Sequence, residues 1–389
     1  MKSLEVPARP LEVAVVTETF PPEVNGVART VGILVDGLIA RGHRVQLIRP
    51  RQGPHDLPID RPRLETVLRP GLPIPGYSGL RMGLPAKRAL LRAWRLKRPQ
   101  VLQVVTEGPL GSSALAAAKA LEIPVCSEFH TNFHSYSRHY GLGLLARPVA
   151  AHLRSLHNRA EVTLVPTAEL ASELGAAGYE RVRVVGRGVD TNLFNPNRRS
   201  DDLRRSWGAA PDDTVAMYVG RLGPEKNLRL FIQATAAMRA FDPRLKVVVV
   251  GDGPAGRALR ASQHEFMFSG MRSGTELAEH YASGDVFVFP SLTETFGNVT
   301  TEAMASRLAV LAYDYAAARQ CIRHGDSGLL APCGNELRFV ALATNLAADR
   351  SLRERLRTGA LSVARTLSWD RVTDDLEAIL SELVRNSAP

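Results

Sequence analysis

Short, unbroken apolar runs alternate along the chain with longer stretches of helical spacing. The first half contains such runs at Leu11 to Thr17, Arg44 to Ile48, Val101 to Val105, Pro124 to Phe129 and Val162 to Pro166. The second half contains them at Val215 to Val219, Lys246 to Val250, Glu265 to Phe268, Val286 to Pro290, Ala309 to Ala312 and Gly328 to Ala331. Continuous hydrophobicity is typical of strands buried on both faces, as in a parallel sheet covered by helices. Two successive series predict an α/β chain with two Rossmann-like domains.

A segment rich in glycine, asparagine and proline separates the two series, at Gly186 to Pro196. This composition favours a linker. We therefore place the boundary near residue 192, with an N-terminal domain over residues 1–192 and a C-terminal domain over residues 193–369. The chain has 389 residues and 45% of them are apolar, which is enough for a sizeable core in each domain.

The cysteines and the lack of long apolar segments indicate the cellular compartment in which the protein is expected. Cys126, Cys321 and Cys333 have neither metal-ligand spacing nor the even number of a disulfide framework, which favours a reducing cytoplasm. Residues 1–10 contain charged side chains and lack the apolar core of a secretion signal. No window approaches the ~18–20 uncharged apolar residues of a spanning helix. We expect a cytoplasmic protein that does not cross a bilayer.

The net charge of +10 attracts anions in general, and its distribution is informative. Residues 81–98 hold seven basic side chains and no acidic one. They predict a cationic amphipathic helix beginning near Pro85. Its functional interpretation is docking on an anionic membrane surface, with contacts from Lys87, Arg88, Arg92, Trp94 and Arg95. Its alternative is the solvated side of a helix packed on a sheet. Nucleic acid is disfavoured, because no recognisable binding module is present.

Two cations follow an apolar strand in the second half. Arg221 and Lys226 lie within the segment Gly220 to Asn227, directly after the run ending at Val219. In open α/β sheets ligands bind beyond the carboxyl ends of strands, where charge-assisted bonds to phosphate oxygens are strong. The alternative is a pair of solvated loop cations.

Two carboxylates eight residues apart, Glu294 and Glu302, follow the run ending at Pro290. They can accept hydrogen bonds from sugar hydroxyls. Glu302 falls on the first turns of a helix predicted to begin near Asn298, so stabilisation of the helix N-terminus is an alternative role.

Gly26 and His130 mark strand ends in the first half. Gly26 precedes the helix that includes Val31 to Leu38, and without a Cβ its backbone can approach a diphosphate closely. An ordinary turn glycine is the alternative. His130 ends the run Val125 to Phe129, and the polar residues after it lie where a core would be apolar.

The segment Gly251 to Gly256 has the spacing of a dinucleotide-binding turn, which raises the possibility of a dehydrogenase. That interpretation fails because the next strand ends at Phe266 to Gly270 without the acidic residue that a ribose needs. The chain also contains no Asp-x-Asp pair, so we predict no metal.

Four segments occur in the order found in the retaining glycosyltransferases of family 4, and together the chain resembles that family. They are Thr19 to Val27, Phe129 to Phe133, Gly220 to Asn227, and Glu294 to Glu302. The resemblance implies the GT-B fold, in which two Rossmann-like domains with parallel sheets face a central cleft. It also implies that a last helix, over residues 370–389, packs back on the first domain.

The family supplies roles for these residues. The resemblance implies that Arg221 and Lys226 would neutralise the departing nucleotide diphosphate. It likewise implies that Glu302 would accept from the ribose and that His130 and Glu294 would meet the donor sugar. Other donor-site residues implied by the resemblance are Gly26, Gly253, Phe296, Gly297 and Asn298. His134, Tyr136, Arg138 and His139 are candidates for the acceptor side, although packing explains them equally well.

The resemblance implies transfer of a hexosyl group from a GDP- or UDP-sugar to a hydroxyl, with retention and without metal or other cofactor. The diphosphate itself would take the acceptor proton on the same face, since no side chain in the motifs is an evident covalent nucleophile. The segment Phe129 to Gly141 is most similar to mannosyltransferases that use GDP-mannose and to diacylglycerol glycosyltransferases. With the basic helix, this favours a membrane lipid as acceptor and a peripheral position on the inner face of the cell membrane.

Three alternatives stay open. The acceptor could be a soluble sugar or metabolite. A nucleotide-sugar epimerase on the same fold would form product without any acceptor. A non-catalytic scaffold for anionic lipid would show no donor turnover, and Glu302→Ala would not affect its binding.

Overall fold

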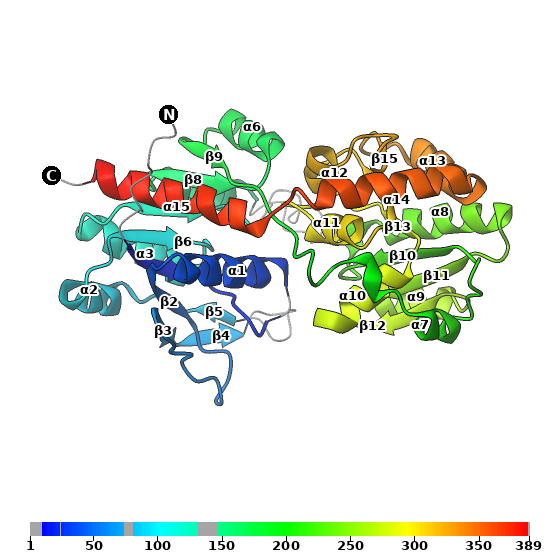
Figure 1. Cartoon of the computed structure of the whole chain (residues 1–389). Helices are drawn as coiled ribbons and strands as arrows, with labels where there is room; N and C mark the ends of the chain where they lie inside the picture. Colours follow the sequence, from blue (N-terminus) through cyan, green and yellow to red (C-terminus); the bar gives the residue numbers. More distant parts are fainter. Residues whose placement is uncertain (1–9, 24, 74–80, 131–145, 388–389) are drawn as a thin grey trace, which may run out of the picture. The chain divides into compact units, whose positions relative to one another are not determined.

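The computed structural model of the chain describes residues 10–23, 25–73, 81–130 and 146–387 (Figure 1). It divides into two compact units. The described residues up to Gly186 and those from Trp369 onward form the first unit, and Arg187 to Ser368 form the second. The chain leaves the first unit slightly before the predicted boundary near residue 192 and returns to it with its last helix.

Among the described residues, the first unit contains a parallel sheet of seven strands in the order β3-β2-β1-β6-β7-β8-β9. The strands are β1 (Glu12–Val16), β2 (Arg44–Pro50), β3 (Leu64–Arg69), β6 (Val101–Val104), β7 (Val125–Glu128), β8 (Val162–Val165) and β9 (Val182–Val184). A short antiparallel pair, β4 (Gly71–Pro73) and β5 (Arg81–Gly83), is separate from this sheet.

Helices cover both faces of this sheet, as the continuous apolar runs predict. Alternate residues of β1 enter different cores, with Val13 and Val15 in one and Ala14 and Val16 in the other. The first core contains side chains of α1 (Gly26–Ala40) and α15 (Trp369–Asn386). The second contains side chains of α2 (Lys87–Leu96), α3 (Pro109–Ala120) and α5 (Ala146–His157). A smaller cluster lies beneath α6 (Ala168–Ala176).

The last helix, α15, packs against α1 (Figure 1). Its apolar side chains recur at helical spacing, at Val372, Leu376, Ile379, Leu380 and Leu383, and all are buried. Glycine at position 37 of α1 allows close approach, because a Cβ there would lie 2.7 Å from Thr373 Oγ1. Arg41 Nε also donates to Asp374 Oδ1 at 2.9 Å. The C-terminal segment is therefore part of the first unit's core.

The second unit contains a parallel sheet in the order β12-β11-β10-β13-β14-β15 among the described residues. Its strands are β10 (Val215–Val219), β11 (Lys246–Val250), β12 (Met267–Gly270), β13 (Val286–Phe289), β14 (Ala309–Tyr313) and β15 (Leu329–Ala331). Its helices are α7 (Asp201–Ser206), α8 (Leu228–Phe241), α9 (Gly256–Ser262), α10 (Gly274–Ser283), α11 (Asn298–Ala305), α12 (Ala316–Cys321), α13 (Glu336–Ala348) and α14 (Arg350–Ala364). Two short 3₁₀ turns, η1 (Pro196–Arg198) and η2 (Pro224–Lys226), precede α7 and α8.

The predicted strands were placed well except at the sheet edges. β3, β9 and the β4–β5 pair were not predicted, and β12 lies two residues beyond the predicted run Glu265 to Phe268. These strands carry many partly exposed positions, so they lack an unbroken apolar run. β12 is also an edge strand whose register with β11 shifts between Val249 and Val250.

The strand orders define a switch point in each unit. In the first, β1 lies between β2 and β6, and in the second, β10 lies between β11 and β13. Chain connections leave neighbouring strands in opposite directions there, which opens a crevice at the carboxyl ends of the strands. Across the described residues, no helix has the length and apolar character needed to span a membrane.

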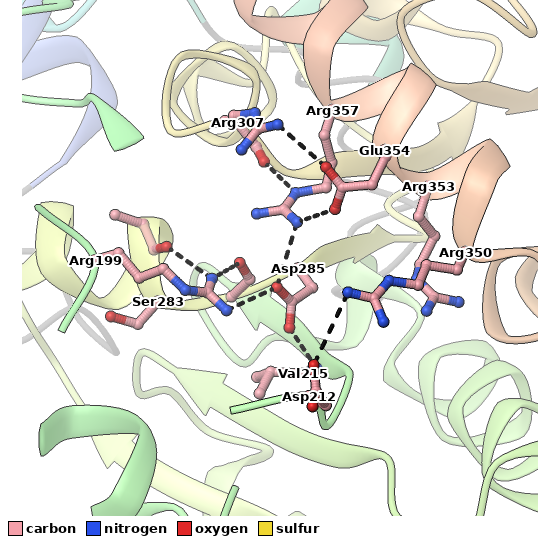
Figure 2. Close-up of polar contacts among 12 residues, drawn as sticks. Arg199, Asp212, Val215, Ser283, Asp285, Arg307, Arg350, Arg353, Glu354 and Arg357 are labelled. Atoms are coloured by element: carbon pink, nitrogen blue, oxygen red, sulfur yellow. Dashed lines mark hydrogen bonds and ion pairs between the residues drawn. The ribbon is translucent and has the colours of Figure 1, made fainter. Parts of the chain in front are cut away.

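An arginine-rich network closes the opposite, amino end of the second sheet (Figure 2). Asp285, immediately before β13, accepts from Val215 N at 2.9 Å, from Arg199 Nη2 at 3.1 Å and from Arg204 Nη1 at 3.0 Å. Arg357 Nη1 lies 3.7 Å from Asp285 Oδ1 and also donates to Glu354 at 2.6 Å. The Asp285 carboxylate thereby joins the segment that contains Arg199 and Arg204 to the starts of β10 and β13 and to α14.

Candidate active site

Two glycine-containing loops pack backbone against backbone beyond β10 and β11. Gly251 has a φ of +130°, and a Cβ there would lie 2.0 Å from the carbonyl oxygen of Gly220. Gly253 has a φ of +157°, and its Cβ would lie 2.6 Å from the carbonyl oxygen of Leu222. Only glycine fits this approach without displacing the loop that carries Arg221. Gly253 therefore has a packing role beside the candidate donor site.

The cations of the β10 loop are held by carboxylates. The Arg221 guanidinium forms an ion pair with the buried carboxylate of Glu225, and its side chain stays 32% exposed. Lys226 Nζ forms an ion pair with Glu294 Oε1 and lies 5.8 Å from the centroid of the Phe289 ring. Lys226 and Glu294 are only 12% and 15% exposed, so this pair is well shielded from water. It joins the loops after β10 and β13 across the switch point.

Glu294 is fixed by its own loop. Ser291 Oγ donates to Glu294 Oε1 at 2.7 Å, and Tyr315 Oη donates to the Glu294 carbonyl oxygen at 2.8 Å. Gly297, with a φ of +95°, turns the chain into α11. A Cβ at Gly297 would contact Glu294 Cγ at 3.4 Å, so the turn lies directly against the carboxylate.

Glu302 lies on α11, which begins at Asn298 as predicted. Its side chain is buried, and Tyr281 Oη donates to Glu302 Oε2 at 3.1 Å. The first turn of α11 contains no acidic residue, so Glu302 lies beyond the turn where the helix dipole acts most strongly. This position does not support the alternative role at the helix N-terminus.

Tyr218 supports the cationic loop from within the sheet. Its hydroxyl donates to the Arg221 carbonyl oxygen at 2.9 Å. Burial, followed by the charges of Glu294 and Glu225, raises the pKa of Tyr218 well above its ordinary value. The hydroxyl therefore stays protonated and keeps its donor role at any physiological pH.

In the first unit, Gly26 and His130 lie after β1 and β7. Gly26 is the first residue of α1, and Asn25 Oδ1 caps this helix by accepting from Ala28 N at 2.8 Å. His130 Nε2 lies 2.7 Å from Glu128 Oε2, and the other oxygen of Glu128 accepts from Gln103 Nε2. Both sites are at the carboxyl edge of the sheet, where ligands of this fold class bind.

Glu18 is a further carboxylate at this edge. It follows β1 and accepts from the backbone N–H groups of Gly83 and of Leu110, the latter at 3.2 Å. Burial raises the pKa of Glu18 to about 7, although these hydrogen bonds oppose the shift. Glu18 thus joins β1 to β5 and to the start of α3.

Comparison with known proteins identifies the family. The family model described as Glycosyltransferase Family 4 matches residues 24–193, and the model described as Glycosyl transferases group 1 matches residues 199–362. A GDP-mannose-dependent alpha-mannosyltransferase from Mycolicibacterium smegmatis is 36% identical over 380 residues, which cover 95% of this chain and 98% of that protein. The chain belongs to glycosyltransferase family 4.

Two further similarities bear on this family 4 glycosyltransferase. An alpha-monoglucosyldiacylglycerol synthase from Streptococcus pneumoniae is 26% identical, over 78% of this chain and 71% of that protein. The solved structure of a sucrose-phosphate synthase from Thermosynechococcus elongatus aligns with a TM-score of 0.76 and 17% identity, covering 96% of this chain and 99% of the other. The structural likeness confirms the predicted GT-B fold with its two Rossmann-like halves.

The structure gathers most of the predicted donor residues of this glycosyltransferase at one edge of the second sheet. They follow β10, β11 and β13 and comprise Arg221, Lys226, Gly253, Glu294, Phe296, Gly297, Asn298 and Glu302. Gly26 and His130 belong to the first unit. The acceptor-side candidates His134, Tyr136, Arg138 and His139 lie outside the described residues. In the described part of the chain, no group of three or more His, Cys, Asp or Glu side chains could hold a metal ion.

The predicted membrane contact of Trp94 is wrong. Trp94 is fully buried in the core beneath α2, and its Nε1 donates to Gln46 Oε1 at 2.9 Å. The helix begins at Lys87. Its apolar face packs against the sheet, whereas the prediction placed that face on a bilayer. The basic residues are different, since Lys87, Arg88, Arg92 and Arg95 are all exposed. They remain candidates for contact with an anionic surface.

Several supporting residues of the glycosyltransferase site were not predicted. Tyr281 contacts Glu302 and Tyr315 contacts Glu294, but each tyrosine lies on a different element from its glutamate. No local sequence motif could therefore have predicted these two tyrosines. Gln103 is the polar residue in the otherwise apolar strand β6, and Glu128 is a charged residue at the buried end of β7. These positions are the signal that could have found them. Glu18 gives a similar signal, because it follows an apolar strand at once.

Proposed function

We propose that this glycosyltransferase transfers a mannosyl group from GDP-mannose to a hydroxyl of a membrane lipid, with retention at the anomeric carbon. The observation that carries the proposal is the pairing of Lys226 with Glu294, beside Arg221, at the switch point of the second sheet. A shielded cation and carboxylate on adjacent loops match a ligand that has a diphosphate at one end and hydroxyls at the other.

Donor binding would divide this pair between two parts of the ligand. Lys226 and Arg221 would turn to the diphosphate oxygens, and Glu294 would accept from a hydroxyl of the sugar. Ser291 keeps Glu294 in place during the exchange, since it donates to the same carboxylate. Glu302, held by Tyr281, would accept from the ribose. The cations then stabilise the negative charge that grows on the departing diphosphate.

The chemistry proposed is a front-face reaction without a covalent enzyme intermediate. The bond between the anomeric carbon and the phosphate oxygen breaks while the acceptor oxygen bonds to that carbon on the same face. The acceptor proton passes to a departing phosphate oxygen. Arg221, Lys226 and the backbone N–H groups at the start of α11 supply the charge stabilisation, so the proposal requires no metal ion.

The names of relatives support the choice of GDP-mannose as donor and of a lipid as acceptor. Three GDP-mannose-dependent alpha-mannosyltransferases, from Mycolicibacterium smegmatis, Mycobacterium tuberculosis and Corynebacterium glutamicum, match 94–95% of this chain at 30–36% identity. An alpha-monoglucosyldiacylglycerol synthase matches as well. The exposed basic residues of α2 are suited to an anionic bilayer, where each contributes about 1 kcal/mol. The proposed site of action is therefore the inner face of a membrane.

Nucleotide titration tests the donor site first. Thermal unfolding of the purified protein would be followed with GDP, UDP, ADP and dTDP in the presence of EDTA, because a ligand that binds the folded state raises its stability. We expect a shift with GDP that the double variant Arg221→Ala/Lys226→Ala abolishes. Arg229→Ala is the matched control, since this exposed cation pairs with Glu336 on α13. No shift with any nucleotide would contradict the proposal and favour a non-catalytic scaffold.

Turnover of GDP-mannose then tests the acceptor. The enzyme would be supplied with diacylglycerol in phosphatidylglycerol vesicles, or with soluble mannose or glucose. Mannosyl transfer to the lipid with an α-linkage supports the proposal, whereas transfer only to the soluble sugar overturns the lipid acceptor. Interconversion of the donor sugar without any acceptor would identify an epimerase.

Vesicle flotation tests the basic helix directly. The triple variant Arg88→Glu/Arg92→Glu/Arg95→Glu should bind phosphatidylglycerol vesicles at least about 100-fold more weakly than the unmodified protein. A control with the same charge change is Arg257→Glu/Arg355→Glu/Arg371→Glu, because these exposed residues lie on other helices. Equal loss in both variants would show that net charge, rather than α2, governs binding.

A further inference from the structure

Three polar side chains form a chain of contacts at the carboxyl end of β7. Gln103 Nε2 donates to Glu128 Oε1, and His130 Nε2 lies 2.7 Å from Glu128 Oε2. Gln103 is 2% exposed, and the side chains of Glu128 and His130 are 1% and 6% exposed. The carboxylate thus sits between an amide and an imidazole with almost no access to water.

The strand pairing fixes this arrangement. Gln103 on β6 is the direct partner of Cys126 on β7, and Glu128 lies two residues further along β7. Side chains two residues apart point to the same face of a sheet, so Gln103 and Glu128 share one face. β7 is also paired with β8, where Glu128 is opposite Leu164. Glu128 is therefore mounted on a central strand with neighbours on both sides, a rigid support for a side chain that must orient another.

Fold stability gives little reason for these residues. Burying an amide and a carboxylate is costly unless their hydrogen bonds recover the loss. Replacing a buried ionic cluster by apolar side chains is often neutral or stabilising. The position of Glu128, two residues before the predicted functional histidine His130, suggests a different reason.

We infer that Glu128, itself held by Gln103, is a positioning residue that sets the orientation and tautomer of His130 for sugar transfer. A carboxylate oxygen accepts hydrogen bonds, so the 2.7 Å contact between Glu128 Oε2 and His130 Nε2 favours the tautomer that carries its proton on Nε2. Nδ1 is then the ring nitrogen that Glu128 does not engage, and in this tautomer it is a hydrogen-bond acceptor. The inference rests on the proposed function for the role of His130, but the tautomer is independent of it.

The first unit contains a second buried pair of a histidine and a glutamate, His43 and Glu377, which serves as a control for the pair of His130 and Glu128. His43 directly precedes β2, at the amino end of the same sheet, and its Nδ1 accepts from Leu11 N at 3.0 Å. Its Nε2 lies 3.1 Å from Glu377 on α15, and the His43 side chain is 0% exposed. Glu377→Gln therefore removes the charge beside a buried histidine far from the strand ends that bind ligand.

Nitrogen-15 NMR of histidine-labelled protein tests the tautomer without any substrate. The His130 signal would be assigned by its loss in His130→Gln. We expect the Nε2–H form in the unmodified protein and a mixture of tautomers in Glu128→Gln, because a carboxamide can accept or donate. Glu377→Gln should leave the His130 signal unchanged. The same Nε2–H form in Glu128→Gln would overturn the inference.

Kinetics with GDP-mannose separates positioning from a merely structural role. Glu128→Gln should lower kcat by about 10- to 100-fold, the usual range when the partner of a functional histidine is lost, while KM for the donor changes less than about threefold. Thermal stability should stay close to that of the unmodified protein, and Glu128→Asp should restore part of kcat. If Glu128→Gln keeps full kcat while His130→Gln loses it, the inference fails and the proposed function stands. If the unmodified protein turns over no nucleotide sugar, the proposed function fails and the NMR result still decides the tautomer.

Discussion

The two ends of the second unit's sheet both concentrate arginine or lysine around carboxylates, but they do so differently. At the amino end, Asp285 accepts from the main-chain N–H of Val215 and from Arg199, and Arg357 lies close by (Figure 2). Arg204 donates to the same carboxylate. At the carboxyl end, Lys226 and Glu294 form a pair between two loops that glycines bring together. A cluster of charges therefore does not identify a site by itself.

The difference lies in what each carboxylate joins. Asp285 joins elements that must stay together. The Arg204 beside it is 2% exposed and also donates to four backbone carbonyls, those of Ala210, Pro211, Asp213 and Ser283. Glu294 and Lys226 join two loops at a switch point, where a ligand can replace each partner of the pair. Arg221 beside them remains one-third exposed. The amino end is accordingly expected to maintain stability, and the carboxyl end to bind the donor.

The largest expected effect is on stability at the amino end. Asp285→Ala leaves the buried Arg204 without its carboxylate and removes the acceptor of the Val215 N–H. Removing one partner of a buried ion pair typically costs about 3–5 kcal/mol, so the free energy of unfolding in urea should fall by that amount. Asp212→Ala is the control, because its contact with Arg350 at 3.9 Å joins two side chains that are more than 75% exposed. A loss below about 1 kcal/mol in Asp285→Ala would remove the distinction between the two ends.

A substitution at the carboxyl end of the sheet should lower the catalytic rate but change the affinity for the nucleotide little. Glu294→Gln keeps the shape of the side chain but removes the charge that pairs with Lys226. We expect kcat with GDP-mannose to fall by about 100-fold or more, as for loss of a charged group that contacts the reacting sugar. The Kd for GDP, measured by calorimetry, should be unchanged or lower, because Lys226 is released to the diphosphate. Weaker GDP binding in this variant would show that Glu294 has a structural role like that of Asp285.

The first unit offers a carboxylate that combines features of both ends. Glu18 anchors backbone N–H groups of Gly83 and Leu110 as Asp285 anchors Val215, yet it lies at a carboxyl edge. Burial raises its pKa from 4.5 to about 7, so between these values the folded protein binds a proton that the unfolded chain has lost. Its contribution is therefore fully present below pH 4.5 and is lost as the pH rises to about 7.

This linkage predicts a change with pH on the order of 1–3 kcal/mol. The free energy of unfolding of the unmodified protein should decline relative to that of Glu18→Gln between pH 5 and pH 8, as followed by urea titrations at each pH. Comparison with the variant isolates Glu18 from Glu23, whose pKa burial also raises. A constant difference between the two proteins across this range would show that Glu18 is ionised throughout.

Sequence reasoning located the ends of the central strands, and with them most of the candidate donor site. The reason is physical, since β10 and β13 are unbroken apolar runs and the motif residues follow them within the same loops. Trp94 shows where this reasoning fails. An amphipathic helix has the same pattern whether its apolar face meets a sheet or a bilayer, and only tertiary packing shows that Trp94 meets the sheet.

Contacts between segments far apart in the chain could not be predicted from the sequence either. Asp285 gathers Arg199, Arg204 and Arg357, which no spacing relates to one another. The edge strands β3 and β9 lack a continuous apolar run, because solvent reaches one side of them. The sequence therefore predicts the candidate ligand-binding groups better than the groups that hold them in place.

The smallest expected effect tests one of those supporting groups. Tyr281→Phe removes the hydroxyl that donates to Glu302 at 3.1 Å and leaves the buried ring in place, packed against Phe194 and Phe287. A hydrogen bond of this kind contributes about 1 kcal/mol, which corresponds to roughly a fivefold rise in the Kd for GDP. Tyr313→Phe is the control, since its buried ring lies in the same core and packs on Phe339 without contact to either motif glutamate among the described contacts. If Tyr281→Phe lowers thermal stability and leaves GDP affinity unchanged, Tyr281 belongs with the Asp285 network as a purely structural group. If GDP affinity falls while stability is kept, the hydroxyl serves the ligand through Glu302, and the carboxyl end has a support that the amino end does not need.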